Sequence, residues 1–269
     1  MGTIQTKGWE LAIDYRHTFK NGLHFGVTAS VADDKTEVTK WTYNTKIPSY
    51  GATGWWDKSA YKEGMVLGDI WGLQFDRFLT EDDFNADGSL KAGLPDQTKV
   101  FPAGYQFAPG DVLYKDLDNN GEIVKQTNTN DKGDLSVIGN ALPRLQFGLN
   151  LDAAWKGFDI SMFFQGVAKR KLWAAGNQVL PGFTTGEPFY KGAEDYWTPE
   201  NTDAFYPRPM DYKQSASGNY SVNDRYLLNM AYLRLKTFTV GYSLPKVWLS
   251  KFKVQGLRVY FTGENLFTI

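Results

Sequence analysis

An acidic stretch near the middle of the chain has the residue types and spacing of a calcium-binding loop. Residues 116–123 read Asp-Leu-Asp-Asn-Asn-Gly-Glu-Ile, which places oxygen-bearing side chains at positions 1, 3 and 5 and a glycine at position 6. Ca²⁺ binds about six to eight oxygen atoms, and a glycine at this position allows the sharp turn that directs them inward. The spacing predicts metal ligands at Asp116, Asp118 and Asn120, with the main-chain carbonyl of Glu122 as a fourth.

The closing ligand of such a loop is absent from its usual position. A calcium loop ends with a bidentate acid at position 12, where this chain has Thr127. We expect Asp131 to replace it if the loop folds back, with Asp134 as the second choice. The alternative is a metal-free Asx turn in which Asn120-Gly121 supplies a positive φ. Both interpretations stay open. A calcium ion held here would be structural, and no cofactor is required.

Tryptophans in the long loops are a second set of candidate site residues. Aromatic faces stack on sugar rings, and unburied aromatic side chains often mark recognition surfaces. The residues predicted to contact a ligand or a partner protein are Trp55, Trp56, Trp173 and Trp197. The alternative is that most loop aromatics pack the large loops against themselves.

Enzymatic chemistry finds little support in the sequence. Acidic pairs such as Asp33-Asp34 could be offered as glycosidase carboxylates, but acids in loops are usually solvated. The chain has no G-x-S-x-G, no glycine-rich phosphate loop and no H-E-x-x-H. With only two histidines and no cysteine, a zinc site is not expected. The net charge of −1 gives no electrostatic footprint for nucleic acid. We therefore predict a protein that is not an enzyme and has no catalytic residues.

The elements that carry these loops are predicted from strict alternation between residues 144 and 166. The side chains predicted to face lipid are Leu145, Phe147, Leu149, Leu151, Phe158, Ile160, Met162 and Phe164. Those predicted to face a barrel lumen are Arg144, Gln146, Asn150, Asp152, Asp159 and Gln165. Period-2 alternation places the two sets on opposite faces of a hairpin whose turn is Lys156-Gly157. Strands of about ten residues cross a bilayer when tilted, although a half-buried soluble hairpin alternates in the same way.

The same pattern elsewhere predicts an all-β fold with three hairpins. We expect six long antiparallel strands in one open, curved sheet, at about residues 8–17, 22–33, 144–155, 158–168, 230–243 and 256–268. The connections between hairpins, about residues 34–143 and 169–229, are far longer than compact soluble domains usually tolerate. Transmembrane β-barrels combine short periplasmic turns with long extracellular loops. Short extra strands are predicted within 65–78 and 98–115, inside the first large loop.

Composition agrees with a portion of a transmembrane barrel. Aromatic residues make up 16 % of the chain, and several stand at predicted strand ends, where interfacial girdles lie. The sequence has no run of about 18 apolar residues, so no transmembrane helix is predicted. The mean hydropathy of −0.42 excludes a helical membrane protein but not a barrel, whose lumen and loops are polar. A strand is predicted to begin at Trp9, close to the first residue, and another continues to Ile269, so we expect a piece of a longer protein.

Eight segments, taken in order, resemble one family. They are Thr6-Lys7-Gly8-Trp9-Glu10-Leu11, Glu63-Gly64-Met65 through Gly72-Leu73-Gln74, Pro109-Gly110-Asp111-Val112 through Asp116-Leu117-Asp118-Asn119-Asn120-Gly121, Ile138-Gly139-Asn140 with Pro143, Gly157-Phe158-Asp159-Ile160 with Phe164-Gln165-Gly166, Trp197-Thr198-Pro199-Glu200-Asn201, Tyr232-Leu233-Arg234-Leu235-Lys236 with Gly241-Tyr242-Ser243-Leu244-Pro245, and Gly263-Glu264-Asn265-Leu266-Phe267. They resemble the C-terminal part of SusC/RagA-type TonB-dependent outer-membrane transporters of Bacteroidetes. Each segment is weak by itself, but eight in family order cover nearly the whole chain.

The resemblance implies a location, a function and partners. It implies a barrel of about 22 strands in the cell outer membrane, in contact with its lipid. It also implies import of oligosaccharides or peptides, a SusD-like surface lipoprotein partner, and TonB acting through an N-terminal region. Residues 1–269 would form the C-terminal part of the barrel, and we expect the plug, the TonB box, the signal peptide and the final strands to lie outside this sequence.

A soluble all-β glycan-binding or adhesion module is the alternative function. Its apolar strand faces would form the core of a sandwich, hidden against a second sheet. A transmembrane barrel would instead present an apolar band about 25 Å tall to lipid. The exposure of the apolar strand faces therefore distinguishes the two.

Overall fold

The computed structural model describes residues 2–42, 63–125, 132–174, 176, 178–181, 190–210 and 218–269. The chain divides into two compact units. One unit, the sheet unit, consists of residues 6–36, 142–170 and 229–269. The other, the loop unit, consists of residues 1–5, 37–141 and 171–228.

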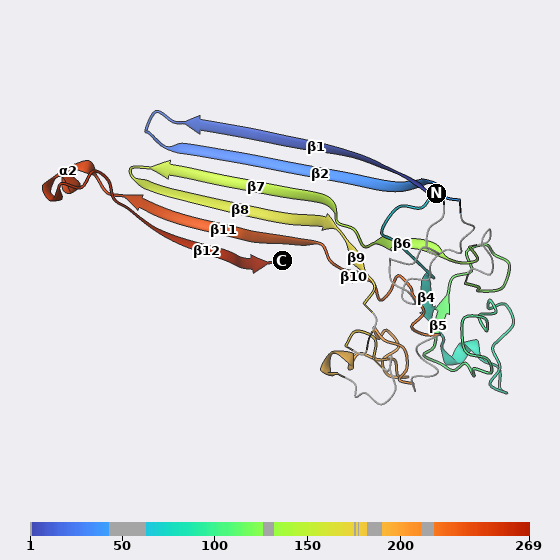
Figure 1. The fold of residues 1–269 in the computed structure, drawn as a ribbon. Helices are drawn as coiled ribbons and strands as arrows, with labels where there is room; N and C mark the ends of the chain where they lie inside the picture. The colour runs from blue at the N-terminus through green and yellow to red at the C-terminus, as the bar shows by residue number, and fades with distance from the viewer. Residues whose placement is uncertain are drawn as a thin grey trace. The chain divides into compact units, whose positions relative to one another are not determined.

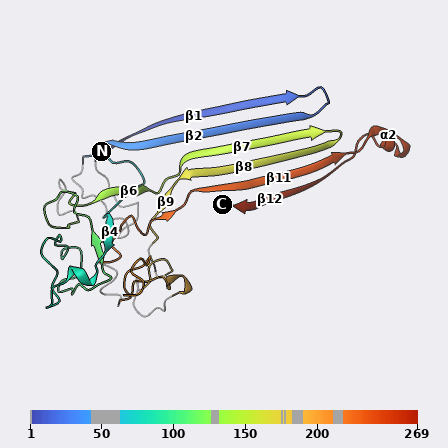
Figure 2. The same cartoon turned by 180° about the vertical axis from the view of Figure 1, so that it is seen from behind.

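The sheet unit is one open antiparallel sheet of six long strands. These are β1 (Thr3–Thr18), β2 (His24–Lys40), β7 (Arg144–Trp155), β8 (Phe158–Lys169), β11 (Tyr232–Ser243) and β12 (Arg258–Thr268). Their spatial order, β1-β2-β7-β8-β11-β12, is also their order along the chain. Both views of the ribbon show the three short turns at the same end of this sheet (Figures 1 and 2). The six predicted strands and the three predicted hairpins are confirmed, with β1 and β2 longer than expected.

The strand register aligns the apolar residues into rows that cross the sheet. One row runs Val27, Leu151, Met162 and Phe238, and the next runs Ala29, Leu149, Phe164, Leu235 and Phe267. A third row, nearest the short turns, consists of Trp155, Phe158, Tyr242 and Val259. Because residues opposite one another point to the same side, one face of the sheet is apolar across five strands.

The other face of the sheet carries polar rows. Thr28, Asn150 and Thr237 belong to one such row, and Asp152, Ser161, Thr239 and Thr262 belong to another. Hydrogen bonds tie neighbouring strands together on this face. Thr239 Oγ1 lies 3.0 Å from Thr262 Oγ1, and Thr28 Oγ1 donates to Asp14 at 2.6 Å. The register therefore separates the two predicted sets of side chains of the central hairpin onto opposite faces.

A β-bulge at Lys236 keeps the apolar residues of β11 on one face. The pairing of β11 with β8 shifts between Leu235 and Thr237, which leaves Lys236 as the extra residue. Before the bulge Leu235 lies opposite Phe164, and after it Phe238 lies opposite Met162. An extra residue shifts the alternation of a strand by one position. The apolar residues of β11 have odd numbers up to Leu235 and even numbers from Phe238, so the bulge keeps both groups on the same face.

Glycines and aromatic rings pack together across β7 and β8. Gly166 lies directly opposite Phe147, and a Cβ atom at Gly166 would come within 2.3 Å of the Phe147 ring. On the polar face, the ring of Phe163 lies 3.4 Å from where a Cβ atom of Gly148 would stand. A phenylalanine that covers a cross-strand glycine restores the apolar contact that the glycine lacks. Phe163 thus contributes an aromatic side chain to an otherwise polar face.

The loop unit contains short strands of its own. They are β3 (Asp69–Gly72), β4 (Phe75–Phe78), β5 (Val112–Tyr114), β6 (Ser136–Asn140), β9 (Lys171–Leu172) and β10 (Leu228–Asn229). They form three two-stranded sheets, β3 with β6, β4 with β5 and β9 with β10. The strands predicted within 65–78 are present as β3 and β4, whereas the segment 98–115 contains only the three residues of β5. β6 was not predicted.

The hydrophobic clusters of the described chain lie in the loop unit. The first contains Leu73, Phe78, Val100, Phe101, Val112, Tyr114, Ile123, Leu135, Trp197 and Ala204. The second contains Ile70, Trp173, Leu180, Tyr220 and Tyr226. Each cluster combines residues of both long connections, so residues about a hundred positions apart share a core. The long connections are therefore a folded unit and not simple linkers.

Helical structure is sparse in the described residues. It consists of α2 (Lys246–Leu249) and the short 3₁₀ turns η2 (Glu81–Asp83), η3 (Lys191–Ala193) and η4 (Ser250–Phe252). None of these described helices has the length and apolar character required to span a membrane.

Candidate functional site

The predicted calcium loop brings three carboxylates together. Oxygen atoms of Asp116, Asp118 and Asp134 all lie within 4.8 Å of one another. Asp134 was the second choice for the closing ligand, and the first choice, Asp131, lies outside the described residues. The chain does fold back as the motif required, because the main-chain N–H of Asp134 donates to the carbonyl of Val124 at 2.9 Å.

Main-chain donors hold these carboxylates in place. Asp134 is fully buried and accepts hydrogen bonds from the N–H groups of Leu117 at 2.8 Å and Val124 at 2.7 Å. Asp116 accepts from the N–H of Gly121 at 2.8 Å, and Asp118 accepts from the N–H of Asn120 at 3.1 Å. These are the contacts of the metal-free Asx-turn alternative. They leave further lone pairs on each carboxylate oxygen, so they are compatible with both interpretations.

The electrostatics of the loop reflect this crowding of acids. Desolvation and the negative charge of Asp134 together raise the pKa of Asp118 above its usual value. Desolvation also acts to raise the pKa of Asp116, but main-chain N–H donors led by Gly121 outweigh it, and the net shift is downward. A divalent cation would stabilise both carboxylates in their charged form.

The two remaining predicted ligands have other contacts. Asn120 Oδ1 accepts a hydrogen bond from the N–H of Glu122 at 2.8 Å, while its amide nitrogen donates to Asp118 at 3.1 Å. The Glu122 carboxylate forms an ion pair with Lys99. This pairing leaves the main-chain carbonyl of Glu122, rather than its side chain, as the oxygen named by the motif. The calcium site stays a prediction.

The predicted ligand-contacting tryptophans divide into two groups. Trp55 and Trp56 lie outside the described residues. Trp173 is 6 % exposed and Trp197 is 7 % exposed, and each belongs to one of the two hydrophobic clusters. Their burial agrees with the packing alternative, because a side chain inside a core presents no face to a ligand. The structure thus gives Trp173 and Trp197 a place in the core of the loop unit.

A buried carboxylate that the sequence analysis did not single out organises the loop unit. Asp111 is fully buried and accepts hydrogen bonds from Arg208 Nε at 2.8 Å, Tyr105 Oη at 2.8 Å and Asn219 Nδ2 at 3.0 Å. The N–H of Ala108 donates to its other oxygen at 2.9 Å. Four donors around one carboxylate satisfy it fully, which is what burial of a charge requires.

Gly110 allows the second long connection to approach this carboxylate. It has a φ of +90°, and a Cβ atom there would lie 2.5 Å from the Trp197 ring. The N–H of Arg208 donates to the carbonyl of Gly110 at 3.0 Å. The segment Pro109-Gly110-Asp111 was noted only as a family-like motif. Its glycine makes room for the indole and its aspartate joins the two connections.

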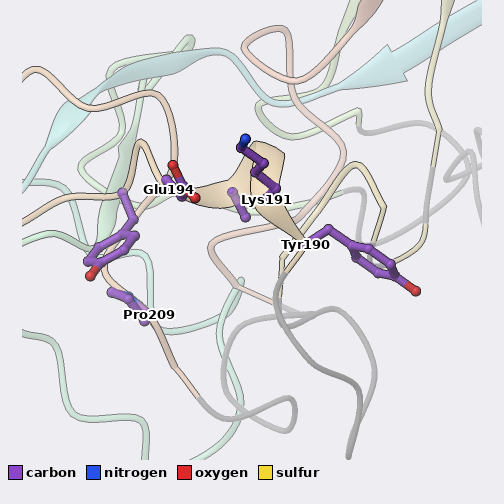
Figure 3. A pocket seen from close by; sticks show the side chains of 6 residues that line it. Tyr190, Lys191, Glu194 and Pro209 are labelled. Atoms are coloured by element: carbon purple, nitrogen blue, oxygen red, sulfur yellow. The ribbon is translucent and has the colours of Figure 1, made fainter.

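A shallow pocket of about 330 Å³ lies in the second long connection. It is lined by Tyr190, Lys191, Ala193, Glu194, Tyr196 and Pro209. Figure 3 shows Lys191 on the short turn η3, with Glu194 and Pro209 to one side and Tyr190 to the other. Tyr190 is 45 % exposed and Tyr196 is 40 % exposed. Exposed aromatic residues in loops indicate a recognition surface. Here the exposed ones are Tyr190 and Tyr196, whereas Trp173 and Trp197 are buried.

The eight side chains predicted to face lipid are not buried. All eight are at least partly exposed, and Phe158 is 59 % exposed. The sandwich alternative required these side chains to be more than nine-tenths buried. Their exposure is contrary to that alternative and agrees with an open segment of a barrel wall.

No family model matches the chain. Two proteins of Formosa agariphila are similar to it: TonB-dependent receptor P3 is 26 % identical over 277 residues, covering 100 % of this chain and 24 % of the receptor. TonB-dependent receptor P26 is 26 % identical over 283 residues, covering 99 % of this chain and 25 % of the receptor. The chain thus spans about a quarter of the length of these relatives.

Solved structures agree in fold. The RagAB peptide transporter aligns with a TM-score of 0.66 at 17 % identity, over 100 % of this chain and 26 % of that one. The RagAB peptide importer in its open-open state aligns with a TM-score of 0.64 at 16 % identity, over 100 % and 25 % of the two chains. The resemblance to TonB-dependent receptors and the fold class predicted from the sequence are therefore confirmed.

Proposed function

We propose that this chain forms part of an outer-membrane TonB-dependent transporter, in which its six-stranded sheet is a segment of the transmembrane barrel wall. Similarity to TonB-dependent receptors over the whole chain and the fold shared with the RagAB transporter support this function. No catalytic role is part of the proposal, because the relatives are receptors and transporters.

The observation that carries the proposal is the separation of apolar side chains between the two units. Both hydrophobic clusters consist of loop-unit residues, whereas in the described sheet unit only Val167, Leu235 and Leu249 are buried hydrophobics. The sheet nevertheless carries complete apolar rows. Exposed apolar area costs about 25 cal/mol per Å² in water, and soluble monomers rarely expose large contiguous patches. Lipid is the environment in which such a face is stable.

The dimensions of the apolar face also suit a bilayer. From Phe147 to Trp155 the rows cover nine residues of β7. A tilted transmembrane strand needs about 9–11 residues to cross the bilayer. The short turns at one end of the sheet and the long connections leaving from the other correspond to the periplasmic and extracellular sides of such a barrel.

The substrate and the partners form the finer part of the proposal. The chain would contribute to import of an oligosaccharide or a peptide through a complex with a SusD-like surface lipoprotein, driven by TonB. RagAB, which shares this fold, is a peptide transporter, and this supports the peptide class. The folded loop unit, with its exposed Tyr190 and Tyr196, is the part of this chain that would meet the substrate or the lipoprotein.

Cysteine labelling of the full-length protein tests the barrel-wall assignment. The 269 residues contain no cysteine, so single cysteines can be introduced at neighbouring positions of β7 once any cysteines elsewhere are replaced. Asn150→Cys should react with a water-soluble maleimide in intact outer membranes, because Asn150 belongs to the polar face. Leu149→Cys and Leu151→Cys should instead react with a lipid-soluble reagent.

The two faces serve as controls for each other. Expression and membrane yield of the three variants should be equal, since each changes one side chain of the same strand. Equal reactivity at positions 149, 150 and 151, or the reverse preference, would contradict a lipid-facing apolar side.

Two further measurements address the partner and the substrate. A tagged full-length protein extracted in mild detergent should retain a surface lipoprotein in near-equimolar amount. Uptake of labelled peptides and of labelled oligosaccharides should then be compared in cells with and without the gene. Recovery without any lipoprotein, or uptake of both ligand classes unaffected by gene loss, would contradict this part of the proposal.

A further inference from the structure

Each of the three short turns of the sheet pairs an exposed aromatic residue with lysine. The first turn has Phe19 and Lys20, the second has Trp155 and Lys156, and the third, which includes α2 and η4, has Trp248 among three lysines. We call residues 18–23, 155–158 and 244–257 the turn surface. Figures 1 and 2 show that these segments lie at the same end of the sheet.

The turn surface is positively charged, although the chain as a whole is not. It contains the lysines Lys20, Lys156, Lys246, Lys251 and Lys253, and no aspartate or glutamate. All five lysines are exposed, and none forms an ion pair with any residue that the structure describes. The nearest acid in sequence, Asp159, is paired with Arg258 at 2.5 Å. The charge of the turn surface is therefore not neutralised from within this part of the chain.

The third turn is ordered and exposes two apolar side chains. Leu249 is buried and anchors the turn, and the N–H of Val254 donates to its carbonyl at 3.2 Å. Lys253 closes η4 with a positive φ of 56°. In contrast to Leu249, Val247 is 74 % exposed and Trp248 is 58 % exposed. An ordered turn that presents valine and tryptophan between lysines has the composition of a segment that rests in a membrane interface.

The row of aromatic side chains next to the turns indicates how deep in a bilayer the turn surface lies. Trp155, Phe158 and Tyr242 lie side by side in that row, with the rings of Phe158 and Tyr242 4.4 Å apart. Lys156 Nζ lies 4.5 Å from the Trp155 ring centroid. Tryptophan and tyrosine concentrate where a barrel meets the headgroup region. The turn surface, which begins at this row, is thus level with lipid headgroups when the sheet lies in a bilayer.

We propose that the turn surface binds the anionic headgroups of phospholipids in the membrane leaflet that it faces. This inference rests on the proposed function, since it requires the sheet to lie in a membrane. Charge complementarity selects the ligand: five unneutralised lysines attract phosphodiester groups, while Trp248 and Val247 insert among the acyl chains. Each lysine near an anionic membrane surface contributes about a fivefold gain in affinity.

The test uses the full-length protein and two matched triple variants. In the first, Lys246, Lys251 and Lys253 are changed to Gln. In the control, the exposed loop-unit residues Lys91, Lys115 and Lys132 are changed to Gln, which removes the same charge elsewhere. Native mass spectrometry in detergent then counts bound phosphatidylglycerol against phosphatidylcholine of the same chain length. Flotation with liposomes reports membrane insertion separately.

The wild type and the control should prefer phosphatidylglycerol, and in the turn variant this preference should fall by about tenfold or more, because three of the five lysines are removed and Lys20 and Lys156 remain. All three should float with liposomes. Unchanged selectivity in the turn variant, or equal losses in both variants, would overturn the proposal while leaving the proposed function intact. If the turn variant kept its lipid selectivity but lost a co-purifying periplasmic protein, the surface would belong to that protein. A wild type that fails to float would overturn both.

Discussion

At the scale of single residues, Asp111 is a buried carboxylate that joins the two long connections of the loop unit. Its four donors come from both long connections, with Arg208 and Asn219 about a hundred positions away in sequence. Removing one partner of a buried ion pair leaves the other uncompensated, at a cost of about 3–5 kcal/mol. Because Arg208 is 26 % exposed, we expect the lower end of that range for Asp111→Asn.

Limited proteolysis of the full-length protein measures this effect. Asp111→Asn should open cleavage sites within residues 63–125 that are protected in the wild type. Asp82→Asn is the matched control, because Asp82 is exposed and, among the described residues, only its main-chain carbonyl accepts a hydrogen bond, from Lys91. Identical protection in the Asp111 variant would show that the network adds little stability.

The ion pair of Asp83 and Arg77 predicts a dependence of loop stability on pH. The two hydrogen bonds from Arg77, at 2.6 and 2.7 Å, lower the pKa of Asp83 from 3.8 to about 2. A depressed pKa contributes stability that is present above the unfolded value and is lost as pH falls through the folded value, here between about pH 4 and 2. Discounted for the 42 % exposure of Arg77, the contribution is roughly 1–2 kcal/mol.

Acid unfolding of the full-length protein, followed by protease sensitivity of residues 63–125, checks this prediction. Asp83→Asn should lower stability at pH 6 and flatten the pH dependence between about pH 4 and 2. The control, Asp82→Asn, changes a neighbouring exposed aspartate whose main-chain carbonyl, and not its carboxylate, accepts a hydrogen bond from Lys91. A wild-type profile that stays flat over this interval would contradict the role of the pair.

The calcium prediction also belongs to the residue scale. If Asp116, Asp118 and Asp134 hold Ca²⁺, their oxygens should close to about 2.3–2.6 Å from the ion. Asp118→Ala should then loosen the loop and leave the strands unchanged, because the motif lies in the loop unit. Calcium titration of the full-length protein with protease mapping of residues 110–140 measures this. Protection that is indifferent to a chelator would identify the motif as an Asx turn without metal.

At the scale of elements, the bulge at Lys236 sets the face that β11 presents. Deleting Lys236 would remove the bulge and leave uniform alternation, with Phe238, Val240 and Tyr242 still on the apolar face with Leu235. We therefore expect this deletion variant to assemble as heat-modifiable protein in the outer membrane. Deleting Thr239 instead would move Val240 and Tyr242 to the polar face and should abolish assembly, so equal assembly of the two deletion variants would contradict the role of the bulge.

The elements show what the sequence could predict and what it could not. The six long strands follow from alternation and short turns, which are local signals. The phase change between Leu235 and Phe238 is also visible in the sequence and could have indicated the bulge. β6 pairs with β3, about 70 positions earlier, and has no alternation of its own to indicate it.

In the candidate site, too, local motifs could be predicted from the sequence, whereas contacts between distant segments could not. The motif at Asp116 and Asp118 is local and was recognised, and Asp134 joins it as one of two named choices. The Asp111 network was missed because its partners Arg208 and Asn219 lie in the other long connection. Loop tryptophans were assigned by residue type alone, which cannot separate core packing at Trp173 and Trp197 from ligand contact.

At the scale of the whole molecule, the sheet unit and the loop unit require different solvents. Both described hydrophobic clusters lie in the loop unit, which can bury its apolar side chains in water. The sheet has no such cover. On β1 alone, Trp9, Leu11, Ile13 and Tyr15 are each between 52 % and 58 % exposed. One chain thus combines a water-compatible part with a part that needs lipid or detergent.

This combination predicts how the 269-residue chain behaves when expressed by itself. Among the described strands, β1 and β12 each pair on one side only, so both edges of the sheet offer unpaired N–H and C=O groups. Unpaired edges beside an exposed apolar face favour edge-to-edge association. We therefore expect the chain to aggregate in aqueous buffer and to disperse in detergent, which covers the apolar rows. Size-exclusion chromatography and thermal melting, with and without detergent, measure this; a monodisperse monomer that melts cooperatively in plain buffer would contradict the membrane assignment.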